Sequence, residues 1–388
     1  MKSCAIFCSL VNPYRKHSNG GSEDIRRRIE ATASIFNSVT VYAIDYLEEL
    51  VAPKSLPTNV DIRLYRRALD PRPWRWHYPL ACIRRYNRQM ILDIRRDLVG
   101  RGNPPLIFLE GMQLFGLWND IKEFVSRDAN IILRAHNIES SYHQSVAGES
   151  GSLLRLTHQL SAKQYKPLED ELLDEFTLTY CVSEMEVEAL RNRYPGLSGR
   201  VRLVLPIPQQ TTLPHSKQIN AGTFNLAYFG DLTLPNNYTG LHWFCDNVLP
   251  RLESEHVHLR VAGKGSERFA SYSSVEVCGF VDYLEDFLAD SHVIIAPIFS
   301  GAGVKIKVLD SISYGKPLIT TPKGAEGFPN WLRDRLNIAQ DAEQFKEMIN
   351  RLMYNYDIAL TESAQTRHLL FENLGPERFR QQLIGDIR

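Results

Sequence analysis

The sequence lacks several features that define common protein classes. It contains no run of eighteen apolar residues, and it therefore predicts no transmembrane helix. It has no low-complexity tract, no internal repeat and no Asp-x-Asp. The N-terminus has only a short apolar stretch and no small-residue cleavage site, so we expect a first β-strand there rather than a signal peptide.

Cysteine is scarce, and its spacing is irregular. The six cysteines lie mostly inside apolar, strand-like runs, and no C-x-x-C occurs. This pattern favours reduced, buried thiols in a cytoplasmic protein over a disulfide framework. The formal net charge is zero, but residues 1–101 hold 18 basic and 10 acidic side chains. Positive charge is therefore concentrated near the start of the chain.

The alternation of elements predicts two α/β domains. A length of 388 residues allows two or three domains at about 150 residues each. Short apolar runs alternate with amphipathic helical stretches, which is typical of parallel sheets covered on both faces. We expect two Rossmann-like, doubly wound domains that face each other across a cleft, with ligands at the carboxyl ends of the strands. Their expected extents are 1–207, a linker at 208–222, and 223–373, with a helix at about 374–388 returning to the first domain.

A basic, aromatic segment lies in the first domain. Residues 63–101 contain eleven arginines and three acids, with Trp74 and Trp76 among them. One helix is predicted over 80–99, with arginines beside its apolar stripe. The segment fits either a packed amphipathic helix with a solvated basic face or a patch for peripheral contact with an anionic membrane. Nucleic-acid binding is not expected, because no recognised module accompanies the patch.

Two segments of the first domain carry candidate ligand groups. Gly20 and Gly21 form a turn in which the backbone can approach a ligand, and Ser22 is expected to cap a helix whose N–H groups favour an anion. A simple turn is the alternative. At the end of a later strand, His136, followed by Asn137 and Glu139, offers donors and acceptors for hydroxyl groups. The alternative there is a histidine that is satisfied by neighbouring backbone groups.

The most specific segment is residues 293–328, in the second domain. A strand is followed by a Gly-Ala-Gly loop and a helix, so the amides at 301–304 can point at a phosphate. On an ideal helix Gly303, Lys307, Asp310 and Tyr314 share one face. Lys307 is then expected to neutralise a diphosphate and Asp310 to accept bonds from ribose hydroxyls. A surface Lys–Asp pair is the alternative.

Four segments, 19–22, 133–143, 228–252 and 293–328, together resemble the retaining family four of glycosyltransferases, or glycosyl transferases group 1. The resemblance implies a GT-B fold and transfer of a hexose, with retention, from a UDP- or GDP-sugar to a glycan or lipid-linked acceptor. Bacterial surface polysaccharide or glycoconjugate synthesis is the expected setting. The implied catalytic residues are His136 and Lys307, and Asn137 and Glu139 are expected to face the sugar or acceptor. The expected donor-binding residues are Gly20, Gly21, Gly230, Asn236, Gly301, Ala302, Gly303, Val304, Lys305 and Asp310.

The sequence also departs from that family. The usual signature is Glu, seven residues, then Glu, and the matching positions here are Ala302 and Asp310. Many relatives hold an arginine and a lysine in the loop where this chain has Asp231 and Asn236. A catalytically idle GT-B-like binding subunit and a nucleotide-sugar epimerase therefore remain alternatives. We expect no cofactor and no essential metal, and a cytoplasmic location that extends to the inner membrane surface if the basic segment contacts lipid.

Overall fold

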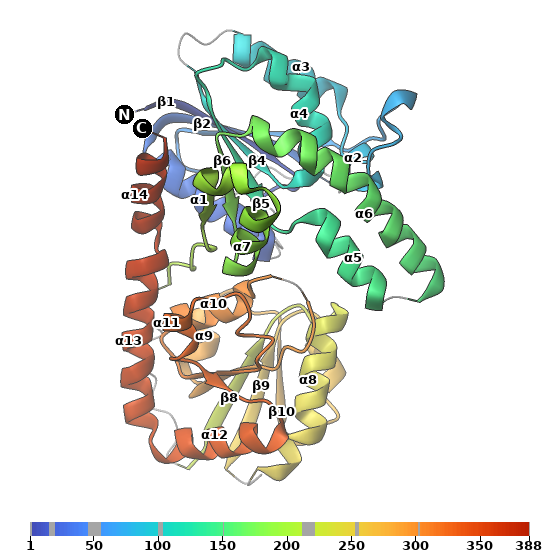
Figure 1. Cartoon of the computed structure of the whole chain (residues 1–388). Helices are drawn as coiled ribbons and strands as arrows, with labels where there is room; N and C mark the ends of the chain where they lie inside the picture. The colour runs from blue at the N-terminus through green and yellow to red at the C-terminus, as the bar shows by residue number, and fades with distance from the viewer. Residues whose placement is uncertain are drawn as a thin grey trace. The chain divides into compact units, whose positions relative to one another are not determined.

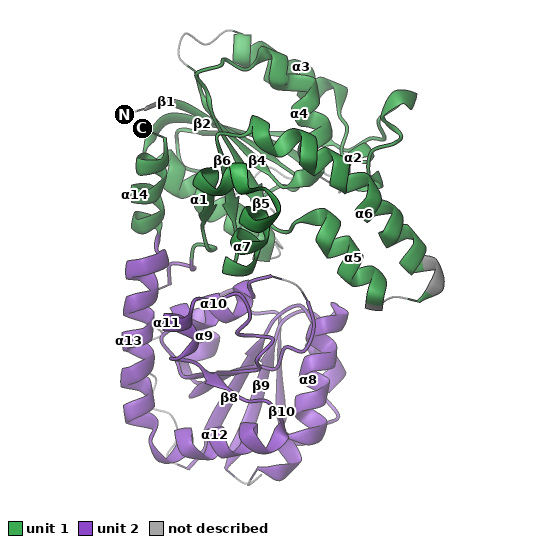
Figure 2. Ribbon diagram, viewed as in Figure 1, with its two compact units in different colours: residues 1–207, 376–388 green, residues 208–375 purple. Residues whose placement is uncertain are grey.

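The computed structural model divides the chain into two compact units (Figure 2). The first unit comprises residues 1–207 and 376–388, and the second comprises residues 208–375. The structure describes residues 2–14, 20–45, 56–99, 104–149, 151–211, 222–252, 256–301 and 303–387.

The first unit is built on a seven-stranded parallel sheet (Figure 1). Its order is β3-β2-β1-β4-β5-β6-β7, so the chain builds outward from β1 in both directions, as in a doubly wound fold. The expected α/β class with a parallel sheet is confirmed here. The strands are β1 (Lys2–Ser9), β2 (Phe36–Asp45), β3 (Val60–Arg66), β4 (Leu106–Glu110), β5 (Asn130–Ala135), β6 (Leu178–Cys181) and β7 (Val201–Leu203).

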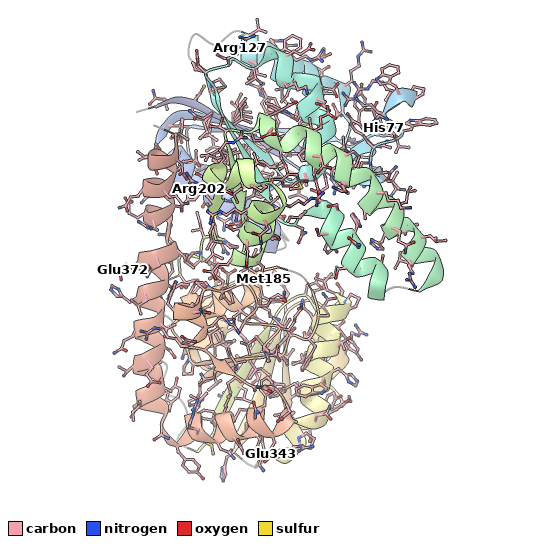
Figure 3. The ribbon with its side chains drawn as sticks, viewed as in Figure 1. His77, Arg127, Met185, Arg202, Glu343 and Glu372 are labelled. Atoms are coloured by element: carbon pink, nitrogen blue, oxygen red, sulfur yellow. The ribbon has the colours of Figure 1, made fainter. Side chains whose placement is uncertain are left out.

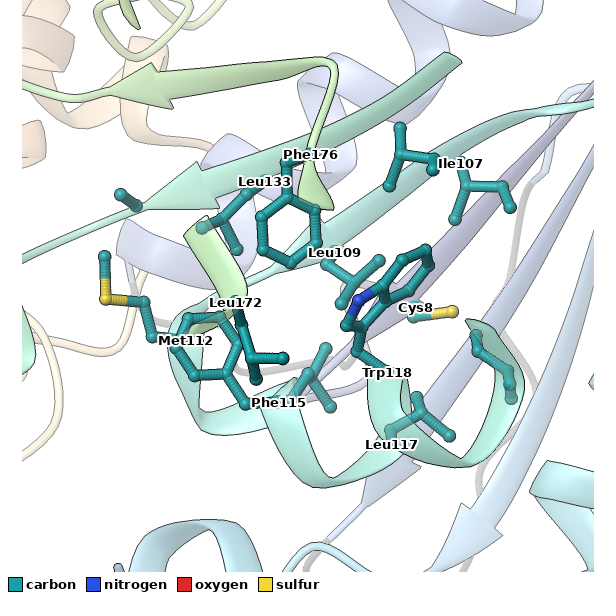
Figure 4. Packing of buried hydrophobic residues seen from close by; sticks show 14 of the residues in the cluster. Cys8, Ile107, Leu109, Met112, Phe115, Leu117, Trp118, Leu133, Leu172 and Phe176 are labelled. Atoms are coloured by element: carbon teal, nitrogen blue, oxygen red, sulfur yellow. The ribbon is translucent and has the colours of Figure 1, made fainter. Parts of the chain in front are cut away.

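Helices cover this sheet and close its core. They are α1 (Gly20–Ala33), α2 (Leu80–Ile83), α3 (Arg88–Val99), α4 (Phe115–Ile121), α5 (Glu139–Glu149), α6 (Ser152–Leu172), α7 (Glu184–Arg193) and α14 (Pro376–Asp386), with short 3-10 turns at Pro73–Arg75, Met112–Leu114, Lys122–Phe124, Leu173–Glu175 and Pro195–Arg200. Figure 4 shows how Trp118 and Phe115 of α4 pack against Leu109 and Phe176 in a buried cluster of the first unit. At this point of the sheet, Leu109 of β4 is therefore covered by aromatic side chains of α4.

The single helix predicted over residues 80–99 is wrong. The structure has two helices, α2 and α3, because an isolated β-bridge pairs Tyr86 with Ala68 and interrupts the helical path. Met90 and Ile94 are buried as the apolar stripe requires, whereas Leu80 is 48 % exposed. The packed, amphipathic interpretation therefore holds for α3.

The second unit contains a six-stranded parallel sheet with the order β10-β9-β8-β11-β12-β13. It confirms the second Rossmann-like sheet. Its strands are β8 (Phe224–Phe229), β9 (Val257–Ala262), β10 (Val275–Gly279), β11 (Val293–Ala296), β12 (Leu318–Thr320) and β13 (Asn337–Ile338). Its helices are α8 (Pro235–Asn247), α9 (Leu284–Ala289), α10 (Ile306–Ser313), α11 (Asn330–Arg333), α12 (Ala342–Tyr354) and α13 (Tyr356–Leu374), with 3-10 turns at Leu249–Arg251 and Ser266–Phe269.

The last helix, α14, packs in the first unit. Arg202 of β7, labelled in Figure 3, forms an ion pair with Asp386 at 3.3 Å. Tyr180 of β6 donates a hydrogen bond from its hydroxyl to Asp386 at 2.8 Å. Phe379 and Leu383 are buried in the cluster that includes α1. The chain end is thus part of the core of the first unit. None of the helices in the described ranges has both the length and the apolar composition to span a bilayer.

Candidate active site

At the carboxyl edge of the second sheet, Gly230 and Gly263 are in close backbone contact. Gly230 follows β8 and donates its N–H to the carbonyl of Ala262 at 3.0 Å. Gly263 follows β9 with φ of 125°, and a Cβ on Gly263 would lie only 2.0 Å from the oxygen of Gly230. These contacts exclude any side chain at position 263, so backbone forms the surface at this end of β8 and β9.

The Gly-rich loop leads into α10, but the helix starts later than its glycines. The helix begins at Ile306, with Lys305 as its N-cap, so Gly303 lies outside it. Gly301 and Gly303 have φ of 103° and 67°, in the left-handed region that favours glycine. Val304 is half-buried and packs against the core cluster of this unit. Ala302 lies outside the described residues.

The predicted helical face is therefore only partly right. Lys307 and Asp310 are half-buried on α10, as expected for residues near a ligand site. Tyr314 is 1 % exposed, caps the end of α10, and packs edge-on against Phe229. Since its ring is part of the core, Tyr314 does not belong to the open face.

Lys307 is the group of the described site that most clearly needs an anionic partner. Its Nζ is buried and has no hydrogen-bond or ion-pair partner among the described residues. The ammonium lies 3.6 Å from the centroid of the Tyr228 ring, and a Cβ on Gly230 would lie 2.8 Å from Nζ. Burial lowers the pKa of Lys307 to about 7. Since no carboxylate offsets the desolvation, an incoming diphosphate would restore the charged form.

The loop after β8 is held by its own side chains. Asp231 accepts hydrogen bonds from the N–H and the hydroxyl of Thr233, and its carbonyl accepts one from Asn237. Asn236 is exposed, and its Nδ2 lies 3.6 Å from the position of a Cβ on Gly301. The structure therefore brings Asn236 and Gly301 together, and it uses Asp231 to shape the loop.

Asp310 contacts the segment that enters this unit. One of its carboxylate oxygens accepts the backbone N–H of Gln209 at 3.2 Å. The same segment is held nearby by Thr211 and Arg367, which both donate to the carbonyl of Ser313. Sequence reasoning assigned Asp310 to ribose hydroxyls and missed this backbone partner, because no local pattern connects residues 209 and 310.

In the first unit, α1 begins at Gly20, so Ser22 lies inside the helix and the predicted cap at Ser22 is wrong. Gly20 is half-buried and Gly21 is exposed. Asn19 lies outside the described residues. The predicted phosphate-facing turn is therefore reduced to two glycines in the first turn of α1.

His136 directly follows β5, at the carboxyl end of the first sheet. Desolvation, assisted by the positive charge of Arg134, lowers the pKa of His136 to about 4. The imidazole is therefore neutral at neutral pH and can both donate and accept a hydrogen bond. Asn137, the next residue, is half-buried.

Four buried charged residues lie close to His136, and no sequence pattern indicated them. Arg28 donates two hydrogen bonds to Glu110, at 2.6 and 2.7 Å. Asp24 pairs with Arg28 at 3.3 Å and with Arg134 at 3.2 Å. Burial opposes ionisation of Asp24, yet the two arginines lower its pKa to about 2. The four formal charges cancel, so the network is internally neutral, and it links α1 to β4 and β5.

Glu139 opens α5 and is 4 % exposed. Its Oε1 accepts a hydrogen bond from Gln113 at 2.7 Å. Burial and the neighbouring carboxylate of Glu169 raise the pKa of Glu139 to about 7. A carboxyl group of this kind titrates in the range where an acid or base is useful. In the described ranges, no three His, Cys, Asp or Glu side chains are grouped so as to hold a metal ion.

Comparison with known proteins gives a family match in the second unit. Residues 223–355 match the family described as Glycosyl transferases group 1. The match covers the carboxyl edge of the second sheet at Gly230 and Gly263, the Gly-rich loop and α10. A curated protein of Klebsiella pneumoniae, described as an uncharacterized 44.6 kDa protein in the cps region, is 24 % identical over 237 residues. That alignment spans 57 % of this chain and 59 % of the relative's length.

Solved structures match the whole chain in fold. Sucrose-phosphate synthase from Thermosynechococcus elongatus has a TM-score of 0.67 at 14 % identity, covering 99 % of this chain and 97 % of that one. HepE from Anabaena in complex with UDP has a TM-score of 0.66 at 12 % identity, covering 99 % of each chain. HepE is also known in complex with UDP-glucose. Residues 223–355 therefore match Glycosyl transferases group 1, and the whole chain shares the GT-B fold of two parallel α/β sheets with these solved structures.

Proposed function

We propose that the protein transfers a hexose from a UDP- or GDP-sugar to a glycan or lipid-linked acceptor, in the synthesis of a bacterial surface polysaccharide or glycoconjugate. The observation that carries this proposal is the unpaired ammonium of Lys307, which lies over Tyr228 beside the bare backbone of Gly230. A cation in such a setting needs an anion that arrives with a ligand. The UDP and UDP-glucose complexes of HepE, a protein of the same fold, support a nucleotide sugar as that ligand.

The chemistry follows from this arrangement. The bond between the anomeric carbon and the phosphate oxygen breaks, and the acceptor oxygen forms the new bond to that carbon. The acceptor proton passes to the leaving phosphate, so the charge and atoms balance. Lys307 and the amides before α10 would stabilise the growing negative charge on the diphosphate. This arrangement gives an ammonium the role that a divalent cation has in other transferases, and retention of configuration is part of the proposal.

The proposed roles in the first unit use groups that form hydrogen bonds with sugar hydroxyls. His136, neutral because its pKa is about 4, would donate or accept a hydrogen bond to a sugar hydroxyl. Asn137 and Glu139 would face the sugar or the acceptor from the same end of the sheet. Gly20 and Gly21 would leave space for the donor beside the first turn of α1.

A thermal-shift screen of UDP-, GDP-, ADP- and dTDP-sugars tests the donor class. A ligand at a hundred times its dissociation constant stabilises the folded protein by about 2.7 kcal/mol, which is readily measured. We expect one nucleotide series to raise the unfolding temperature of wild-type protein and not of Lys307→Met. The proposal is wrong if no nucleotide sugar or nucleoside diphosphate binds.

A catalytically idle binding subunit is the second candidate, and the loop after β8 favours it. Residues 230–236 contain no lysine or arginine, so this loop offers no cation to the diphosphate, and the carboxylate of Asp231 only accepts hydrogen bonds from Thr233. Donor hydrolysis separates the two functions, because binding without turnover under any acceptor supports the idle subunit. Product analysis by NMR would identify the third alternative, an epimerase.

Membrane contact through residues 63–101 is part of the proposal, but the structure changes its chemical basis. Several arginines of this segment form internal ion pairs, among them Arg72 with Asp120 at 2.6 Å. Trp74 and Trp76 are 69 % and 63 % exposed instead. Exposed tryptophans suit the membrane–water interface. We expect co-sedimentation with anionic liposomes, and its loss in Trp74→Ala/Trp76→Ala; no binding to liposomes by the wild type would end this part of the proposal.

A further inference from the structure

We propose that Lys305 and Glu326 form a clamp that fixes Gly301 and Gly303, so that the amides leading into α10 are held ready for the donor diphosphate. This inference rests on the proposed donor site. It assigns Lys305 a positioning role in place of the direct donor contact expected from the sequence, and it adds Glu326, which the sequence did not indicate.

The geometry of the Lys305 ammonium carries the inference. Its Nζ donates to the carbonyl of Gly301 at 3.0 Å and to the carbonyl of Gly303 at 2.6 Å. The carboxylate Oε2 of Glu326 lies 3.6 Å from the same Nζ. A lysine ammonium has three donors and no acceptor. Two of its donors are therefore directed at loop carbonyls, and the carboxylate of Glu326 adds an ion-pair contact.

Glu326 is anchored independently of the Gly-rich loop. It belongs to the segment after β12, and Lys323 forms an ion pair with it at 2.7 Å. Thr321 holds that segment in place, because its hydroxyl donates a hydrogen bond to the carbonyl of Ile298 and accepts one from the N–H of Gly324. The carboxylate thus connects a braced turn to Lys305, whose side chain is only 11 % exposed.

The clamp would restrict the conformational freedom of the Gly-rich loop. Gly301 and Gly303 adopt φ of 103° and 67°, and glycine loses more conformational freedom on ordering than any other residue. A loop that is ordered only by its ligand would lose affinity, whereas one ordered beforehand keeps it. By drawing the two carbonyls to one side, Lys305 defines the loop shape before the donor arrives.

Lys305→Met tests the clamp directly, with Glu326→Gln as the second variant. Lys346→Met is the matched control, because Lys346 is a partly exposed lysine on α12 that forms an ion pair with Glu343. The first measurement is hydrogen exchange of the peptide spanning residues 299–309 in ligand-free protein. The second is calorimetric binding of UDP and UDP-glucose.

We expect faster exchange at 299–309 and about tenfold weaker UDP binding in Lys305→Met, as for the loss of a charge-assisted hydrogen bond. Glu326→Gln should show the same changes to a smaller degree, since its contact to Nζ is longer. Lys305→Arg should keep the exchange rate and the UDP affinity close to those of the wild type, because arginine can also donate to carbonyls. The control should match the wild type in both measurements.

Three results would overturn the clamp. Weaker UDP binding with unchanged exchange would make Lys305 a direct phosphate ligand. Faster exchange with unchanged binding would show that loop order does not serve the donor, and no change in either would remove the role altogether. If wild-type protein binds no nucleoside diphosphate, the proposed function fails, whereas the exchange measurement still reports on the Lys305 contacts by itself.

Discussion

Arg28 and Glu110 form a bidentate ion pair with both side chains fully buried, at 2.6 and 2.7 Å. The pair joins α1 to the end of β4. Removal of two charges from water costs several kcal/mol per ion, and the attraction between them repays this only with good geometry and further hydrogen bonds. Asp24 and Arg134 supply those further contacts here.

Arg28→Met should therefore destabilise the protein strongly. It leaves the carboxylate of Glu110 buried without its guanidinium, a change that costs about 3–5 kcal/mol. Arg26→Met is the control on the same helix, because Arg26 pairs with Glu23 and Glu30 near the surface and its loss should cost about 1 kcal/mol or less. Urea unfolding of both variants measures the difference. Equal stabilities would show that the buried network does not hold α1 in place.

Lys307→Met should lower turnover much more than stability. Removal of one preorganised donor to a developing charge typically reduces kcat by about 10²–10³-fold. The same change removes a buried, unpaired ammonium, so the unfolding free energy should stay the same or rise. Steady-state kinetics with the donor found in the screen, together with urea unfolding, give both numbers. Full activity in Lys307→Met would exclude Lys307 from the reaction.

The affinity for the nucleotide sugar should also depend on pH through Lys307. Its pKa is about 7 in the free protein, and the donor diphosphate favours the charged ammonium. Binding therefore takes up a proton above pH 7, and the affinity should fall by up to about tenfold per pH unit there. Calorimetry in buffers of different ionisation enthalpy measures the uptake. Lys307→Arg should bind without pH dependence in this range, and a flat wild-type profile would contradict the mechanism.

The sequence predicted the fold class well because its signal is periodic. Apolar runs such as those of β8 and β11 are short, continuous and separated by helical stretches, so two parallel sheets could be expected. The glycines at 301 and 303 were visible for a similar reason, since few residues other than glycine adopt positive φ. The helix was expected to start near residue 303, but α10 begins at Ile306, because Gly303 has a left-handed φ and lies outside the helix.

Contacts between distant residues could not be predicted in the same way. The carboxylate of Asp310 meets the N–H of Gln209, 101 positions away, and Arg28 meets Glu110, 82 positions away. A single sequence has no periodic signal for such pairs, because they depend on how elements pack in three dimensions. For the same reason, the contact between Glu326 and Lys305 could not be predicted from the sequence. The roles of His136, Lys307 and the donor-binding residues stay predictions until a ligand is bound.

Gly263→Ala should disrupt the candidate donor site at the carboxyl edge of the second sheet. A Cβ at Gly263 would lie 2.0 Å from the oxygen of Gly230, in a backbone conformation that L-residues rarely adopt. The backbone of Gly230 must move, and we expect a loss of stability of about 3 kcal/mol or more, together with loss of UDP binding. Gly279→Ala is the control, since its φ is also positive but nothing lies within 4 Å of its Cβ. Unchanged UDP binding in Gly263→Ala would show that the backbone at this edge of the sheet does not form part of the donor site.

Glu139→Gln should stabilise the protein at alkaline pH and have little effect at acidic pH. The folded pKa of Glu139 is raised to about 7 from an ordinary value of 4.5, so the folded state keeps a proton that the unfolded state releases. Its contribution to stability is fully present below pH 4.5 and is lost as the pH rises to about 7. Glutamine mimics the neutral acid, and we expect a gain of about 2 kcal/mol over wild type at pH 8. Glu188→Gln, on the exposed side of α7, should change stability little at either pH. If Glu139→Gln is instead destabilising at pH 8, the ionised carboxylate is the stable native form, and Glu139 is not held as a neutral acid beside Glu169.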